Sequence, residues 1–143
     1  MRLLARQHAC GIAAAAILAL TACSKNSSTP TSPSTPANTT DTFSATIAQQ
    51  GSVNHQFKVS ANGKVTVTLT SVAPLSTMAL GIGLMTSDGT SCITTETQND
   101  NARANTAALQ GIAVAGNYCI RVYDSGNIPD STTVTYTVTV QHP

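Results

Sequence analysis

Two stretches of the chain alternate between apolar residues and threonine. In GKVTVTLTS, residues 63–71, and TTVTYTVTV, residues 132–140, every second side chain in the alternating part is apolar and those between are mostly threonine. A repeat of two residues places the apolar side chains on one face of an extended strand, whereas a helix would scatter them. Threonine on the other face keeps the β-branched preference for strands and leaves a hydroxyl for water. Each stretch therefore predicts a strand with one buried face.

Weaker alternation of the same kind occurs elsewhere in the chain, and turn-forming residues separate the segments. Seven or eight short strands without a helical pattern bury their apolar faces most simply by packing two sheets together. We therefore predict an all-β domain at residues 42–141, an antiparallel β-sandwich of jelly-roll-like form. The weaker strands are TFSATIA (42–48), SVNHQFKV (52–59), MALGIGLM (78–85) and GNYCIRVYD (116–124), and the turns are ANG (61–63), SDG (87–89), AGN (115–117) and DSGNIPD (124–130).

The N-terminus has the features of a secretory signal peptide. Arg2 and Arg6 precede about fourteen mostly apolar residues, a run shorter than the roughly twenty needed to span a bilayer core. The run ends at Leu20-Thr21-Ala22-Cys23, which resembles the lipobox of bacterial lipoproteins. This resemblance implies a helical signal peptide at residues 1–22, cleavage before Cys23, and a diacylglycerol and palmitate anchor on that cysteine. The alternative is an ordinary signal peptide followed by an incidental cysteine.

The segment after Cys23 is typical of a disordered tether. Residues 23–41 are rich in Ser, Thr, Asn and Pro, and such a composition cannot bury enough apolar surface to offset the entropy lost on ordering. We expect the lipid on Cys23 to anchor the protein to a membrane and this segment to act as a linker that keeps the domain at a distance from it. The residue directly after Cys23 is Ser24 and not aspartate. In the sorting pattern of such lipoproteins this favours the outer membrane, with the domain facing the periplasm or the cell surface.

The order of short motifs across the domain resembles the bacterial pre-peptidase C-terminal (PPC) domain. The motifs are Gly51, Phe57-x-Val59, Gly63-x-Val65-x-Val67-x-Leu69, Leu80-x-Ile82-x-Leu84, Asp88-Gly89, Gly116-x-Tyr118-x-Ile120-x-Val122 and Tyr136-x-Val138-x-Val140. The resemblance implies a β-sandwich module of a class often appended to secreted proteases, with relatives that bind collagen or polysaccharide. Residues 1–143 contain no segment that we interpret as a protease, and LSTMALGIG lacks the acidic residues that often precede the middle strand.

The cysteines predict one disulfide. Cys10 lies in the signal segment and Cys23 takes the lipid, so that Cys92 and Cys119 remain and should pair in an oxidising compartment. Strand alternation places Cys119 with Arg121 and Tyr123, opposite Tyr118, Ile120 and Val122, so the bridge should lie outside the main core. It would tie the turn after SDGTS to the penultimate strand.

Charge and motif content argue against two classes of function. From residue 42 the chain has four Lys and Arg against five Asp and Glu, with no basic run to neutralise phosphates, so a nucleic-acid partner is not expected. No nucleophile elbow, HExxH or phosphate loop occurs, and neither an enzyme nor a cofactor is expected. A small hydrolase using His55 remains an alternative. The non-catalytic explanation is that His55 lies at the start of a strand, half exposed, with a backbone hydrogen-bond partner. That position would explain why a polar residue has the same strand phase as the apolar residues.

Candidate binding residues are few. Asp124, Asn127 and Asp130 carry oxygens that calcium accepts, but they equally stabilise turns through their own backbone. Tyr123 is the one tyrosine out of phase with the core. The polar stretch TETQNDNARAN, 95–105, is predicted to be the longest loop; it is a candidate contact surface, although such a stretch is more often a solvated loop. The predicted function is a lipid-anchored, non-catalytic envelope module that contacts a protein or a polysaccharide. The alternative is a structural or stress-related lipoprotein with no specific ligand.

Overall fold

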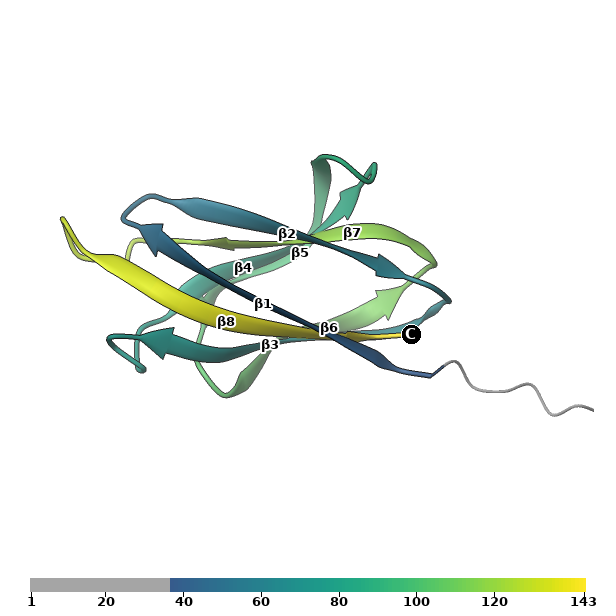
Figure 1. Cartoon of the computed structure of the whole chain (residues 1–143), viewed down its shortest axis with the longest axis horizontal. Coiled ribbons are helices and arrows are strands. Elements are labelled where there is room, and N and C mark those ends of the chain that lie inside the picture. The colour runs from purple at the N-terminus through teal and green to yellow at the C-terminus, as the bar shows by residue number, and fades with distance from the viewer. Residues whose placement is uncertain (1–36) are drawn as a thin grey trace, which may run out of the picture. The chain divides into compact units, whose positions relative to one another are not determined.

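The computed structural model describes residues 37–143, and this part of the chain contains eight strands and no helix (Figure 1). The predicted all-β class is therefore confirmed. Within these residues there is no helix long and apolar enough to cross a membrane. The strands are β1 (Thr39–Ala48), β2 (Ser52–Val59), β3 (Gly63–Ala73), β4 (Leu80–Ser87), β5 (Cys92–Ala102), β6 (Thr106–Ala113), β7 (Gly116–Tyr123) and β8 (Thr133–His142).

The strands form two antiparallel sheets of four that face each other. The first sheet has the order β1-β8-β3-β6 and the second β2-β7-β4-β5. In Figure 1 they form two layers, with β2, β7, β4 and β5 in one and β1, β8, β3 and β6 in the other. This strand order is that of an eight-stranded jelly roll, so the sandwich prediction and its jelly-roll-like form both hold.

The core lies between the two sheets and consists of the side chains that the alternation placed there. Val65, Val67 and Leu69 of β3 are at most 1% exposed. Tyr136 of β8 is fully buried between its apolar neighbours in the strand. The threonines between them point outward, and two cross-strand hydroxyl pairs, Ser44 with Thr137 and Thr46 with Thr135, join β1 to β8. Thus the sequence period of two corresponds directly to the two faces of the sheets.

The prediction of a loop at residues 95–105 was wrong. Residues 92–102 form β5, and after a short turn at 103–105 the chain continues as β6, which the alternation had not revealed. β5 is the outermost strand of the second sheet, and nearly all its side chains are exposed or half exposed. An edge strand of this kind is held by main-chain hydrogen bonds to β4 rather than by burial of one face, so it carries no apolar alternation.

The ordered domain begins earlier than residue 42. Thr39, Thr40 and Asp41 pair with residues 142–140 of β8 and so belong to β1 rather than to the linker. At the other end, Pro143 accepts a hydrogen bond from the Ser60 N–H through its carbonyl oxygen. Paired main-chain groups hold even a polar Thr-Thr-Asp segment in a strand. The predicted signal peptide, Cys23 and the linker up to residue 36 lie outside the described residues.

Candidate functional site

The outer face of the second sheet carries the clearest candidate site. Alternation along β7 points Cys119, Arg121 and Tyr123 away from the core, as the sequence predicted. In the neighbouring strand β4, the residues paired with them are Met85, Gly83 and Gly81 respectively. Two glycines on this face leave space beside the larger side chains of β7. The candidate site lies where these glycines of β4 are next to the large side chains of Arg121 and Tyr123.

Tyr123 fills the space above the first of these glycines. Its ring lies where a Cβ atom of residue 81 would be, so only glycine fits beneath it. The Tyr123 hydroxyl donates a hydrogen bond to Oδ1 of Asp100 on β5. Burial, followed by this bond and the Asp100 charge, raises the pKa of Tyr123 to about 12. The Arg121 guanidinium carbon stands 5.6 Å from the centre of the ring, within the range of a cation–π contact. The ring is therefore fixed from three sides.

Gly83 forms the floor of a hollow next to this ring. A Cβ atom at residue 83 would meet the nearest atoms of Thr95, Thr97 and Gln98 at 3.9 Å, an ordinary contact distance, so a small side chain fits there, in contrast to Gly81. The hollow has a volume of about 210 Å³. Its walls come from β4, β5 and β7 and consist of Met85, Thr95, Gln98, Asp100, Arg121 and Tyr123. We call this the Gly83 hollow.

The predicted disulfide lies at one end of the same face. Cys92, the first residue of β5, is bonded to Cys119 of β7, and Cys119 pairs with Met85 of the hollow. Cys119 is fully buried but does not belong to the central apolar cluster, which agrees with the expected place of the bridge outside the main core. The disulfide thus links the start of the edge strand β5 to β7, two strands away in the same sheet.

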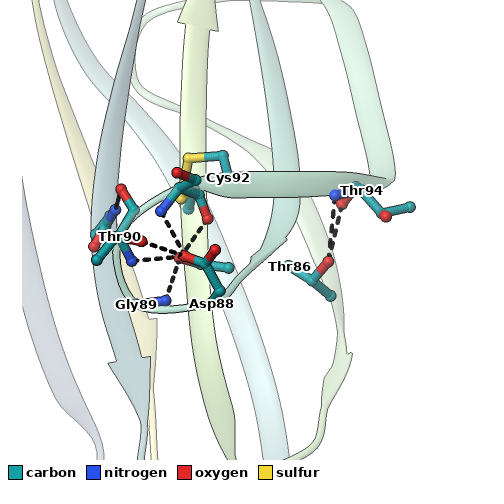
Figure 2. The surroundings of a disulfide bond; sticks show 10 residues. Thr86, Asp88, Gly89, Thr90, Cys92 and Thr94 are labelled. Carbon is teal, nitrogen blue, oxygen red and sulfur yellow. Dashed lines mark hydrogen bonds between the residues drawn. A yellow bond between two sulfur atoms is a disulfide. The ribbon is translucent and has the colours of Figure 1, made fainter.

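The turn between β4 and β5 is held by a carboxylate (Figure 2). Oδ1 of Asp88 accepts hydrogen bonds from the Thr90 and Ser91 main-chain N–H groups and from the Thr90 hydroxyl. The bonds from Ser91 and Thr90 lower the pKa of Asp88. The Gln56 side chain of β2 donates to the Thr90 carbonyl at 2.6 Å, so the turn is also joined to the far edge of the sheet. Turn and disulfide together position the β5 wall of the hollow.

The calcium candidates have other hydrogen-bond partners. Oδ1 of Asp124 accepts from the N–H groups of residues 126, 127 and 128, and Oδ2 accepts from the Gln50 N–H. Desolvation raises the pKa of Asp124, but these four bonds outweigh it and the net shift is downward. Asn127 donates to the Ala79 carbonyl, and Asp130 accepts from Gln49. Across residues 37–143, no three His, Cys, Asp or Glu side chains lie close enough together to hold a metal ion. The geometry favours the turn-stabilising role.

His55 has a side-chain partner rather than the expected backbone partner. Its Nε2 lies 2.7 Å from the Tyr136 hydroxyl, and its ring stacks on Phe43 at 4.9 Å between centroids. It lies in the middle of β2 rather than at the start of a strand. Desolvation lowers the pKa of His55, and burial raises that of Tyr136 to about 12. Among the described residues no carboxylate bonds to His55, so it lacks the orienting partner of a catalytic triad.

His142 is the more buried histidine, which the sequence did not indicate because it is next to the C-terminus. It is 3% exposed, and its Nε2 lies 3.1 Å from Oδ2 of Asp41. Its Nδ1 lies 3.1 Å from the Pro143 carbonyl oxygen. Both ring nitrogens therefore have partners within the domain, and the arrangement ties the last residues to the start of β1.

The structure brings one sequence candidate, Tyr123, together with residues that the sequence did not single out. Gln98 and Asp100 lie in the stretch that the sequence predicts as a loop, and nothing in the sequence distinguishes Gly83 from an ordinary strand residue. The signal that was present is the Gly-x-Gly spacing at 81–83, which leaves two successive outward positions without side chains. Nothing in one sequence shows that Tyr123 covers only one of them.

Comparisons with known proteins add little to this geometry. No protein-family model matches the chain, and its sequence matches no curated protein. Among solved structures it is similar to the crystal structure of Aeromonas hydrophila PliG, a periplasmic lysozyme inhibitor of g-type lysozyme. The similarity covers 71% of this chain and 83% of that one, with a TM-score of 0.49 and 15% sequence identity. A match at this level does not transfer a function.

Proposed function

We propose that this protein is a lipid-anchored, non-catalytic binding module of the bacterial cell envelope, which contacts its partner through the outer face of the second sheet. The observation that carries the proposal is the Gly83 hollow. It combines an aromatic ring in a fixed position with an amide, a carboxylate and a guanidinium around a glycine floor. Binding sites typically combine a concave shape with a few polar groups in fixed positions.

Export and anchoring are supported by three features that agree with one another. The N-terminal segment resembles a lipoprotein signal peptide that ends at Cys23. A tether-like composition follows it, and the domain contains a disulfide, which persists in oxidising compartments. The outer membrane is proposed on Ser24 alone. The PPC-like order of motifs also fits a non-catalytic module.

The anchor is tested by Cys23→Ser. This substitution should abolish incorporation of labelled palmitate and leave unprocessed precursor in the membrane fraction. Processing of the variant to the same mature length would instead mean that an ordinary signal peptidase acts here.

Binding is tested by capture of envelope components on the immobilised full-length protein. Gly83→Val fills the hollow and should reduce capture strongly. Gly111→Val is the matched control, because a Cβ atom at residue 111 on β6 has no atom within 4 Å. Equal capture by wild type and both variants would contradict the proposed surface. No capture by any of them would favour the alternative of a structural lipoprotein without a specific ligand.

A further inference from the structure

We infer that the Gly83 hollow binds one neutral sugar ring of a glycan, with the ring packed beside Tyr123. The inference rests on the proposed function, because it assigns a ligand class to the same surface. It is argued from the size of the hollow, the balance of its charges and the rigidity of its aromatic wall.

The size limits the ligand to a single ring. At about 210 Å³ the hollow is smaller than the roughly 300–1,000 Å³ of pockets that enclose drug-sized ligands. It lies on the outer face of a sheet, and the side chains of Thr95, Gln98, Asp100 and Arg121 around it are exposed. One ring of a longer chain can therefore enter while the neighbouring units continue along the surface.

The polar walls favour a ligand that is rich in hydroxyl groups and carries no net charge. Asp100 accepts hydrogen bonds, Arg121 donates them, and the Gln98 amide does both. Only Oδ1 of Asp100 is engaged by Tyr123, and within the described chain Oδ2 of Asp100 and the Gln98 amide have no hydrogen-bond partner. With one carboxylate on β5 and one guanidinium on β7, the charges of the walls balance, so the hollow does not select for a net charge on its ligand. Hydroxyls suit both, because each is a donor and an acceptor.

The half-exposed Tyr123 ring offers an apolar contact to the C–H groups of a sugar. The Tyr123 ring packs over Gly81, its hydroxyl is bonded to Asp100, and the Arg121 guanidinium stands over the ring. A ring held in this way loses little freedom when a ligand packs against it, which lowers the entropic cost of binding. Met85 at the other end of the hollow adds a second apolar contact.

Saturation-transfer NMR on the purified full-length protein tests the inference. The protein is kept in a detergent without a sugar head group, and the ligands are methyl glucoside, galactoside, mannoside and N-acetylglucosaminide at millimolar concentration. Irradiation of the protein's aromatic protons should transfer saturation to at least one of them. The transfer should be strongest at protons on one face of the sugar ring, because that face would lie nearest to Tyr123. Few other aromatic rings would contribute, since the chain has only two Phe and three Tyr.

Two pairs of variants locate the site. Gly83→Val should weaken binding at least about tenfold, whereas Gly111→Val should leave it unchanged. Gln98→Ala, at an exposed position of β5 where folding is not at risk, should weaken binding about two- to tenfold. Gln110→Ala, exposed on β6, is its matched control.

Three outcomes would overturn the inference. Transfer that survives Gly83→Val unchanged would place the sugar elsewhere. No transfer to any sugar, together with envelope capture that is lost in Gly83→Val, would assign the hollow to a protein side chain and leave the proposed function intact. No transfer and no capture would remove both proposals.

Discussion

The ring of Tyr123 occupies the position that a side chain at Gly81 would need. The two residues are directly paired across β7 and β4, and a Cβ atom at residue 81 would overlap the Tyr123 ring. Two residues further along β4, Gly83 faces the same side, and a Cβ atom there would overlap no neighbour. The same residue type thus has two roles on one strand face, since one glycine seats an aromatic ring and the other leaves a hollow open.

Alanine substitutions should separate these roles. Gly81→Ala should lower the free energy of unfolding by about 1–3 kcal/mol, because the Tyr123 ring must move and loses its bond to Asp100. Gly83→Ala should be neutral or raise it by up to about 1 kcal/mol, since alanine restricts the unfolded chain and meets only ordinary contacts. Urea unfolding of both variants measures the difference. Equal effects would mean that the ring does not depend on Gly81.

Removal of the disulfide should cost substantial stability. The bond joins residues separated by 27 positions, so replacing Cys92 and Cys119 with serine should lower the free energy of unfolding by about 2–4 kcal/mol. Mass analysis without reductant should first show the linked peptides and no free thiol at either position. Two free thiols in protein isolated from the envelope would be at odds with the bonded structure and with export to an oxidising compartment.

Asp124 should stabilise its turn without calcium. Asp124→Ala removes the acceptor of four main-chain N–H groups and should lower the free energy of unfolding by about 1–3 kcal/mol. Asp130→Ala, which removes one exposed bond to Gln49, should change it by less than about 0.5 kcal/mol. Thermal melts with added calcium and with a chelator should coincide for the wild type. A calcium-dependent rise in Tm that disappears in Asp124→Ala would restore the metal-site hypothesis.

His55 should make the protein less stable in mildly acidic solution. Desolvation lowers its pKa below the ordinary 6.5, so the unfolded chain binds the proton more readily than the folded one. The contribution of neutral His55 is therefore complete above pH 6.5 and decreases as the pH falls through and below that value. Urea unfolding between about pH 7.5 and about pH 5 should show the decrease.

The matched variant is His55→Gln, which is neutral throughout and keeps a polar group near the Tyr136 hydroxyl. It should reduce the slope of stability against pH over this range. An unchanged slope would mean that other groups cause it.

The sequence alone determined the strands that bury one face, because alternation is a local property that follows directly from the two-residue repeat of an extended chain. β3 and β8 were predicted with the correct inward residues for this reason. The Cys92–Cys119 pair followed from elimination among four cysteines.

Only the tertiary structure decided the composition of the candidate site. β5 is held to β4 by main-chain bonds and buries almost nothing. Its side chains therefore carry no pattern, and the sequence predicts a loop at Gln98 and Asp100. His55 likewise gained its partner from Tyr136, 81 residues away in the chain. The contacts of Tyr123 with Gly81 and Asp100 depend on the register of three strands, which is set by the packing of the whole sandwich. Strand formation follows a local period, whereas a site that spans several strands depends on how those strands are aligned.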